Sequence, residues 1–228
     1  MKNKKGVHHV EYVIAVSIFI ICVLAVLYIS HFSLRSNEGN SFLLLEKEFR
    51  ERTEIPVKIA NLTITTTKTC FNVPFNTNFQ GSPDNLIIKE GGSVIDFNFD
   101  SSNNIHVGSH GSGKYSLFFS EYFESVSSGP TCDPTEDYSY SFIKEEEFVF
   151  YDKLEEFREN YSKDYREFRK QLGFDRDFSI IIKQGEEILF NITEFEPFDV
   201  RVYAKEFKIK IIDENANVQE ALVNMRIW

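Results

Sequence analysis

The amino-acid sequence predicts an α+β protein. A long N-terminal transmembrane helix is expected to precede a β-rich extracellular domain, an antiparallel sheet or sandwich with one amphipathic helix packed on it. Residues 12–30 carry no charge, residues 57–150 alternate in short apolar and polar steps, and residues 148–172 change to a helical spacing. The expected divisions are a basic leader at 1–6, a transmembrane and assembly helix at 7–38, and the β-rich domain at 39–228.

The composition favours a folded chain with an acidic surface. Hydrophobic residues make up 42% of the 228 residues, and the 23 Phe and 10 Tyr suit half-buried sheet surfaces. The formal net charge of −10 would repel a phosphate backbone, so we expect no nucleic-acid partner.

The apolar run at residues 12–30 reads YVIAVSIFIICVLAVLYIS. About 20 apolar residues in a helix cross a hydrocarbon core, so this run predicts a single membrane span. A secretory signal peptide is the alternative, but no small-x-small cleavage site follows residue 30. The lysines of the leader then predict a cytoplasmic N-terminus and an extracellular C-terminal domain.

The residues before this run form a motif, Lys5-Gly6-Val7-His8-His9-Val10-Glu11-Tyr12. It resembles the class III signal peptide of archaeal type IV prepilins, in which a basic leader ends in Gly and Glu stands fifth in the mature chain. Val7 and the polar pair His8-His9 depart from the usual pattern. The resemblance implies cleavage after Gly6 by a prepilin-type peptidase and assembly with other pilin-like subunits.

Glu11 is a candidate assembly residue. A carboxylate at the edge of an apolar span costs free energy unless it is paired or hydrated. The resemblance implies that the amine freed on Val7 pairs with Glu11 of a neighbouring subunit and fixes their register. The alternative is a Glu11 that lies among lipid headgroups beside His8 and His9.

The expected elements follow in order. A polar break at residues 36–41 separates the span from a short amphipathic helix that ends before Pro56. Alternating apolar segments punctuated by Gly, Pro and Asp predict strands on both sides of a second helix. The strand-like segments are 57–67, 85–90, 93–100, 114–123, 178–183, 187–193, 199–212 and 221–228.

The helix predicted at about 148–172 has the strongest pattern. Apolar residues recur every three or four positions from Tyr151 to Leu172, and Gly173 can close the helix. This aromatic stripe is typical of packing on a sheet. The acidic run Glu145–Glu147 suits the solvated N-terminus of this helix.

Cysteines and sequons add candidate covalent sites. Cys70 and Cys132 form either a disulfide or two buried free thiols, and both alternatives stay open because the sequence does not give their separation. Asn61, Asn160 and Asn191 begin Asn-x-Ser/Thr sequons and are candidate glycosylation sites.

No motif points to catalysis. Residues 108–115 resemble a P-loop, but Tyr115 stands where Ser or Thr would bind magnesium, and a strand-like segment follows. His106 and His110 are four residues apart in a glycine-rich segment, which favours loop histidines over a zinc site. We therefore expect no enzyme activity, cofactor or metal.

Two functional hypotheses remain. The resemblance implies a structural or minor subunit of a type IV pilin-like surface filament, assembled through its N-terminal helix. The alternative is a single-pass, membrane-anchored, adhesin-like binding module that does not assemble.

Overall fold

A computed structural model describes residues 5–65, 69–75, 85–100, 102, 104–108, 112–124, 129–193 and 199–228. Within the first helix, it describes the side chains of residues 12–28 and from residue 40 onward. The chain divides into two units, Met1–Lys47 and Glu48–Trp228, which we call unit 1 and unit 2. Each unit is described by itself.

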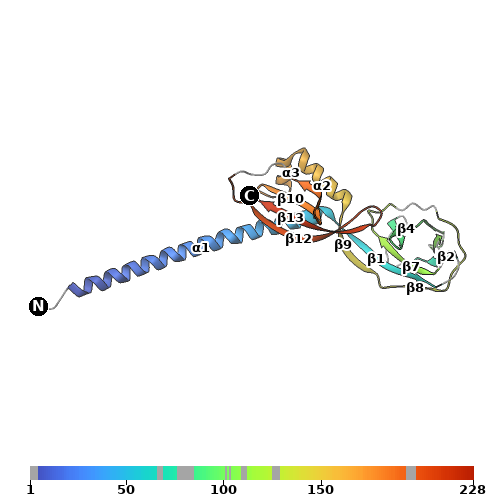
Figure 1. Cartoon of the computed structure of the whole chain (residues 1–228), viewed down its shortest axis with the longest axis horizontal. Helices are drawn as coiled ribbons and strands as arrows, with labels where there is room; N and C mark the ends of the chain where they lie inside the picture. The colour runs from blue at the N-terminus through green and yellow to red at the C-terminus, as the bar shows by residue number, and fades with distance from the viewer. Residues whose placement is uncertain are drawn as a thin grey trace. The chain divides into compact units, whose positions relative to one another are not determined.

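The first helix, α1, runs from Lys5 to Thr53 over 49 residues (Figure 1, blue). It continues through residues 36–41, so the predicted break and the separate short helix are wrong. Polar residues cost an α-helix only a few tenths of a kcal/mol each, and Gly costs about 1 kcal/mol. The helix forms despite these penalties, so the turn-forming composition of residues 36–41 does not mark a break.

The predicted transmembrane helix is also wrong. Among the helices and side chains that the structure describes, none is both long and apolar enough to cross a membrane. The predicted single-pass localisation, with a cytoplasmic N-terminus and an extracellular C-terminal domain, required that span. This prediction is therefore wrong as well.

Strands dominate the described residues of unit 2. Their bounds are β1 Glu54–Ile64, β2 Cys70–Pro74, β3 Leu86–Glu90, β4 Ser93–Val94, β5 Phe97–Phe99, β6 Asn104–Gly108, β7 Gly113–Phe119, β8 Tyr138–Tyr140, β9 Lys144–Phe150, β10 Phe178–Gln184, β11 Glu187–Ile192, β12 Tyr203–Ile212 and β13 Val218–Ile227.

Ten of these strands form one mixed sheet. Its order is β11-β10-β13-β12-β9-β1-β7-β3-β4, and β8 pairs with β1 beside this path. The neighbours are antiparallel except β9 and β12, which run parallel where Val149 lies opposite Ile211. The prediction of a purely antiparallel sheet or sandwich was therefore wrong. The crossover from β9 passes through helices, and such a connection returns the chain in the parallel direction.

The central strand β1 follows α1 without a loop. Ile55 precedes Pro56, and the residue before a proline is driven towards an extended conformation, which ends the helix. The Arg50 guanidinium pairs with the Glu54 carboxylate across this junction. One half of β1 then pairs with β9 and the other half with β7.

A smaller antiparallel sheet has the order β2-β6-β5. It packs against β1, β3 and β7 around an apolar cluster in which Phe71, Leu86 and Ile105 are fully buried. Tyr115 also lies here, with its ring centroid 5.0 Å from that of Phe71. We call this cluster the first core.

The predicted helix at about 148–172 is two helices, α2 (Tyr151–Lys163) and α3 (Tyr165–Gln171). Its first residues belong to β9 instead. Asp164 interrupts the helix with a φ of −152°, and its carboxylate accepts a hydrogen bond from the Glu167 amide at the start of α3. The single helix was therefore a wrong prediction.

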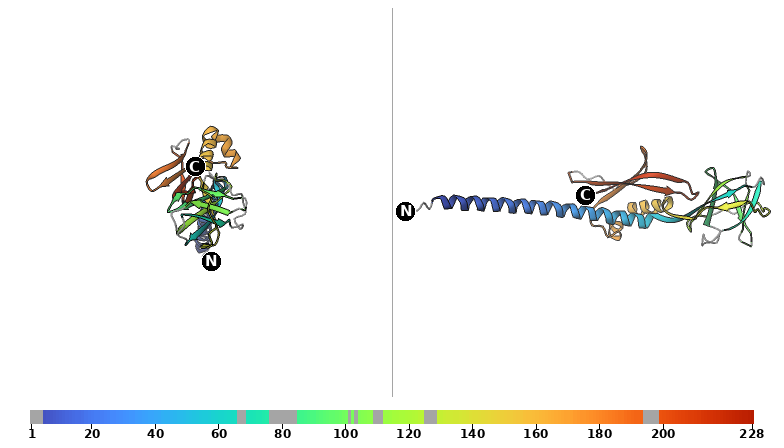
Figure 2. Two further views of the ribbon diagram at one scale, coloured as in Figure 1. Left: turned by 90° about the vertical axis from the view of Figure 1, so that its right-hand side faces the viewer. Right: turned by 90° about the horizontal axis from the view of Figure 1, so that it is seen from below.

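Both helices lie along one face of the β10–β13–β12 part of the sheet (Figures 1 and 2). Phe157 of α2 makes edge-on contacts with Phe49 of α1 and Phe168 of α3, at centroid distances of 5.7 and 4.9 Å. The Tyr161 hydroxyl donates to the Phe178 carbonyl over 3.1 Å. The aromatic stripe of this segment packs on the sheet.

Candidate functional site

The predicted processing and assembly residues lie at the start of α1. Gly6, Val7 and Glu11 belong to this helix, but their side chains fall outside the described part of the chain. The proposed contact of Glu11 with a neighbouring amine stays a prediction.

The side chains that follow form an uncovered apolar surface, which we call the apolar stretch (residues 12–28). Its large hydrophobic residues are exposed by 39% at Val16 to 73% at Tyr28. Consecutive residues such as Ile20 and Ile21 are both exposed, so apolar groups surround the helix axis. Ser17 turns its hydroxyl back to the Val13 carbonyl, at 2.8 Å. The stretch thus presents apolar groups on every side.

Cys70 and Cys132 form a disulfide, with their Cα atoms 5.5 Å apart. The alternative of two free thiols is therefore not the state in this structure. The bond joins the start of β2 to the segment between β7 and β8, across 62 residues of sequence. Cys22, in the apolar stretch, is a free and exposed thiol.

The three sequon asparagines lie on exposed positions of different elements. Asn61 is on β1, Asn160 on α2 and Asn191 on β11. The Asn61 carboxamide oxygen accepts a hydrogen bond from the Ser116 hydroxyl at 3.1 Å. Exposure permits glycosylation, which stays a prediction at each site.

The P-loop-like segment at residues 108–115 is described at its two ends. Gly108 ends β6 and Gly113 begins β7, whereas residues 109–111, including His110, lie outside the described residues. Gly113 therefore opens a strand at the place where a P-loop would open a helix. No group of His, Cys, Asp and Glu suited to a metal ion occurs among the residues that the structure describes.

The acidic run Glu145–Glu147 lies in β9 rather than before a helix, so the predicted role at a helix N-terminus is wrong. Glu146 accepts hydrogen bonds from the ammonium groups of Lys144 and Lys210, which lower the pKa of its carboxyl. This pairing ties β9 to β12.

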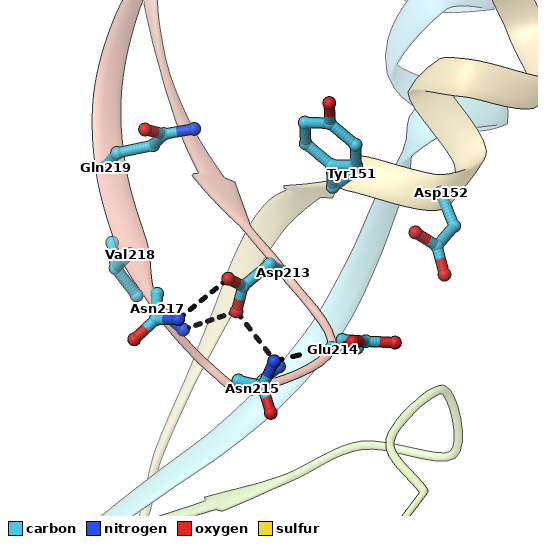
Figure 3. A pocket seen from close by; sticks show the side chains of 8 residues that line it. All are labelled: Tyr151, Asp152, Asp213, Glu214, Asn215, Asn217, Val218 and Gln219. Carbon is cyan, nitrogen blue, oxygen red and sulfur yellow. Dashed lines mark hydrogen bonds between the residues drawn. The ribbon is translucent and has the colours of Figure 1, made fainter. Parts of the chain in front are cut away.

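A pocket of about 510 Å³ lies beside the β12–β13 turn (Figure 3). Tyr151 and Asp152, at the start of α2, also line this hairpin pocket. The Asp213 carboxylate accepts hydrogen bonds from the backbone amides of Asn215 and Asn217, at 2.9 and 2.7 Å. It also accepts one from the Asn217 carboxamide at 2.7 Å.

A buried lysine holds the same turn from the other side. Lys89 on β3 is 7% exposed, and its ammonium donates to the carbonyls of Asn215 and Ala216 at 3.3 and 3.2 Å. It also donates to the Asn217 carboxamide oxygen at 2.6 Å. Burial lowers the pKa of Lys89, and the charge of Asp213 opposes that shift.

His106 was predicted to be a loop histidine, but it lies on β6, so that prediction is wrong for this residue. His106 is buried beside the disulfide, and its Nδ1 accepts a hydrogen bond from the Cys132 amide at 2.8 Å. Its Nε2 therefore carries the proton and lies 3.2 Å from the Asp100 carboxylate. The His106–Asp100 proximity in sequence was a usable signal, but its partner in the Cys132 segment was not visible there.

No family model, no curated protein and no solved structure matches the chain.

Proposed function

We propose that this chain is a subunit of a type IV pilin-like filament that assembles through α1. The observation that carries this proposal is the apolar stretch, whose residues 12–28 are exposed around the whole helix. Burying one large aliphatic or aromatic side chain is worth about 1.5–3 kcal/mol, so leaving this surface in water is costly. A helix that is apolar on all sides needs several neighbours to cover it.

Copies of the same helix meet that need. A bundle of apolar stretches surrounds each helix with surfaces of its own kind, and it contains no charged side chain from residue 12 to residue 28 to desolvate. Glu11 stands at the border of this stretch. Its carboxylate then requires a cationic partner, and the amine that cleavage after Gly6 exposes on Val7 is one.

Mass spectrometry of the native protein tests the processing step. Removal of residues 1–6 by a prepilin-type peptidase predicts a chain that begins at Val7. The substitution Gly6→Leu should block this cleavage, since it adds bulk at a junction that the resemblance assigns to glycine. An intact N-terminus in native protein would remove the processing step from the proposal.

Assembly is tested separately with Glu11→Gln. This change keeps the shape of the side chain and removes the charge, and we expect at least a tenfold loss of sedimentable filaments. Glu38→Gln is the matched control, because it makes the same change in α1 beyond the apolar stretch. Equal filament yield from both variants would contradict the role of Glu11.

A further inference from the structure

The β12–β13 turn brings an amine and a carboxamide into direct contact. Lys89 on β3 and Asn217 in the turn are 128 residues apart in sequence, yet the lysine nitrogen Nζ lies 2.6 Å from the carboxamide oxygen of Asn217. A C=O bond is about 1.2 Å long, so the carboxamide carbon Cγ lies within about 4 Å of Nζ. Reacting atoms in a poised pair are about 3–3.5 Å apart, so this contact is near the geometry for attack of the amine on the carbon.

The Lys89 side chain is held at this place before any reaction. Its nitrogen also donates to the carbonyls of Asn215 and Ala216, so three acceptors from one turn surround it. The residue is almost fully buried. A free lysine side chain has many rotamers, and folding has already removed that freedom here. Such prior ordering of two groups is a main source of rate in intramolecular reactions.

The surroundings favour the neutral form of the Lys89 amine, which is the nucleophilic form. The cross-strand neighbours of Lys89 are Val94 on β4 and Ser116 on β7, and neither carries a charge. Burial lowers the pKa of Lys89, and the charge of Asp213 opposes that shift. Lysines desolvated in this way are the ones that proteins use as amine nucleophiles.

The turn fixes the orientation of the Asn217 carboxamide (Figure 3). Its nitrogen donates to the Asp213 carboxylate at 2.7 Å, and its oxygen accepts from Lys89. Ala216, the preceding residue, has a φ of +53°, in the left-handed region that residues other than glycine rarely adopt. Such a conformation persists only where surrounding contacts determine it. The carboxamide therefore presents its carbonyl to the amine and its nitrogen to the carboxylate.

The Asp213 carboxylate is placed to move the proton that amide exchange requires. It touches the Asn217 carboxamide nitrogen Nδ2, the atom that leaves when an amine replaces it. After attack, Nζ and Nδ2 are both bonded to Cγ, so a carboxylate that holds Nδ2 lies next to Nζ as well. A carboxylate between two nitrogens can take a proton from one and deliver it to the other by general acid–base catalysis.

We propose that Lys89 and Asn217 form an intramolecular isopeptide bond. Lys89 first loses its ammonium proton to water, and the neutral amine then attacks Cγ of Asn217. The Nζ–Cγ bond forms and the Cγ–Nδ2 bond breaks, while Asp213 carries one proton from Nζ to Nδ2. One amine and one carboxamide thus give one substituted amide and one ammonia, and no oxidant or cofactor takes part. Asp213 and Asn217 line the hairpin pocket, which gives the ammonia a route to solvent.

The bond joins two distant parts of the large sheet. Along the sheet, β9, β1 and β7 lie between β12 and β3, and the bond links β3 directly to the turn that follows β12. A covalent link across 128 residues restricts the unfolded chain as a disulfide does, but a reductant does not open it. The proposal is independent of filament assembly, because both residues belong to unit 2.

Mass spectrometry of the denatured full-length chain tests the proposal. We expect a mass about 17 Da below that of the sequence, beyond the change due to the disulfide, because one ammonia is lost when the amine displaces it. Fragmentation of tryptic peptides should then show a branched peptide in which Lys89 is joined to Asn217. The branch is decisive, since a succinimide at an asparagine causes the same mass loss without joining two peptides.

Unmodified peptides at both positions, after incubation of the folded chain at neutral pH for several days, would overturn the proposal. The branched peptide contains no residue of α1. Its presence or absence is therefore read separately from cleavage after Gly6 and from filament assembly.

Lys89→Arg is the first variant, because arginine keeps the positive charge and the hydrogen-bond donors but is not a nucleophile at neutral pH. We expect no loss of ammonia. Lys210→Arg is the matched control: Lys210 also donates from the large sheet, but to the Glu146 carboxylate, so the full mass loss should persist. Loss of ammonia at the same position in Lys89→Arg would contradict the assignment.

Two variants in the turn complete the test without altering the buried lysine. Asn217→Ser, at an exposed position, should abolish the branched peptide. Asp213→Asn keeps an oxygen acceptor for the turn amides but cannot carry the proton, so the bond should form at least about tenfold more slowly after refolding. An unchanged rate in Asp213→Asn would remove the proton-carrying role, and a Lys89 branch that persists in Asn217→Ser would overturn the choice of Asn217.

Discussion

Two parts of α1 differ in the burial of their apolar side chains. In the apolar stretch of α1, Phe19 is 69% exposed, whereas Phe49 near the end of the helix is fully buried. The difference does not follow from apolar content, which is higher around Phe19. It follows from pattern: charged residues such as Arg50 and Arg52 flank Phe49, so one face of the helix can pack while the other is solvated.

The comparison shows how much of an apolar helix surface the same chain can cover. A single apolar face needs one neighbour, and Phe49 finds it in Phe157 of α2. An apolar surface on every side needs several neighbours, and described side chains of the apolar stretch remain exposed. We therefore expect the first part of α1 to matter for association and the last part to matter for the stability of unit 2.

The sharpest way to break this comparison is to make the same substitution in both parts. Phe49→Ala should lower the free energy of unfolding by about 3–5 kcal/mol, because it leaves a cavity beside Phe157. Phe19→Ala should change it by less than about 0.5 kcal/mol, as expected for an exposed side chain. Urea denaturation followed by tyrosine fluorescence measures both, and similar losses would show that the apolar stretch is buried in solution.

Cysteines allow a parallel test with a smaller expected effect. The double change Cys70→Ser, Cys132→Ser opens the disulfide and should cost about 2–4 kcal/mol, since the bond restricts a long segment of the unfolded chain. Cys22→Ser, in the apolar stretch, should leave unfolding unchanged. Denaturation with and without reductant separates the two, and insensitivity of the wild type to reductant would count against the bond.

Much of the strand content was predictable because short-range pattern determines it. The segments predicted at 178–183, 187–193 and 221–228 overlap β10, β11 and β13, and Gly185 forms the turn between β10 and β11 with a φ of +60°. In each, alternating apolar residues and a flanking turn act within a few positions. Such signals need no knowledge of distant partners.

The wrong predictions concern features that depend on residues distant in sequence or on the sum of many small free-energy contributions. The parallel pairing of β9 with β12 joins Val149 to Ile211, residues far apart in sequence. Lys89 is buried by a turn more than a hundred residues away, and no local pattern around this lysine indicates that contact. The predicted break at residues 36–41 was wrong for another reason: the helix on both sides outweighed the local preference for a turn.

The candidate sites divide along the same line. Gly6 and Glu11 are visible in sequence because their spacing is local. The pocket lined by Asn72, Asn104 and Thr135 was not, because these residues come from three segments. The disulfide was the nearest available signal, since it brings two of those segments together.

The smallest expected effect concerns acid. Hydrogen bonds from the Asn104 amide and carboxamide, opposed by partial burial and aided by His106 and Ser102, lower the Asp100 pKa to about 2. Since the ordinary value is 3.8, Asp100 stabilises unit 2 fully above about pH 5, and this contribution is lost as the pH falls through 2. The stability difference between wild type and Asp100→Asn should therefore shrink between pH 5 and pH 2.5, as urea denaturation at the two pH values would measure.

Asp152→Asn, which removes one negative charge elsewhere in unit 2, provides the control. A difference that stays constant with pH would show that Asp100 does not titrate with folding, and its support for Asn104 would then have to be independent of its charge.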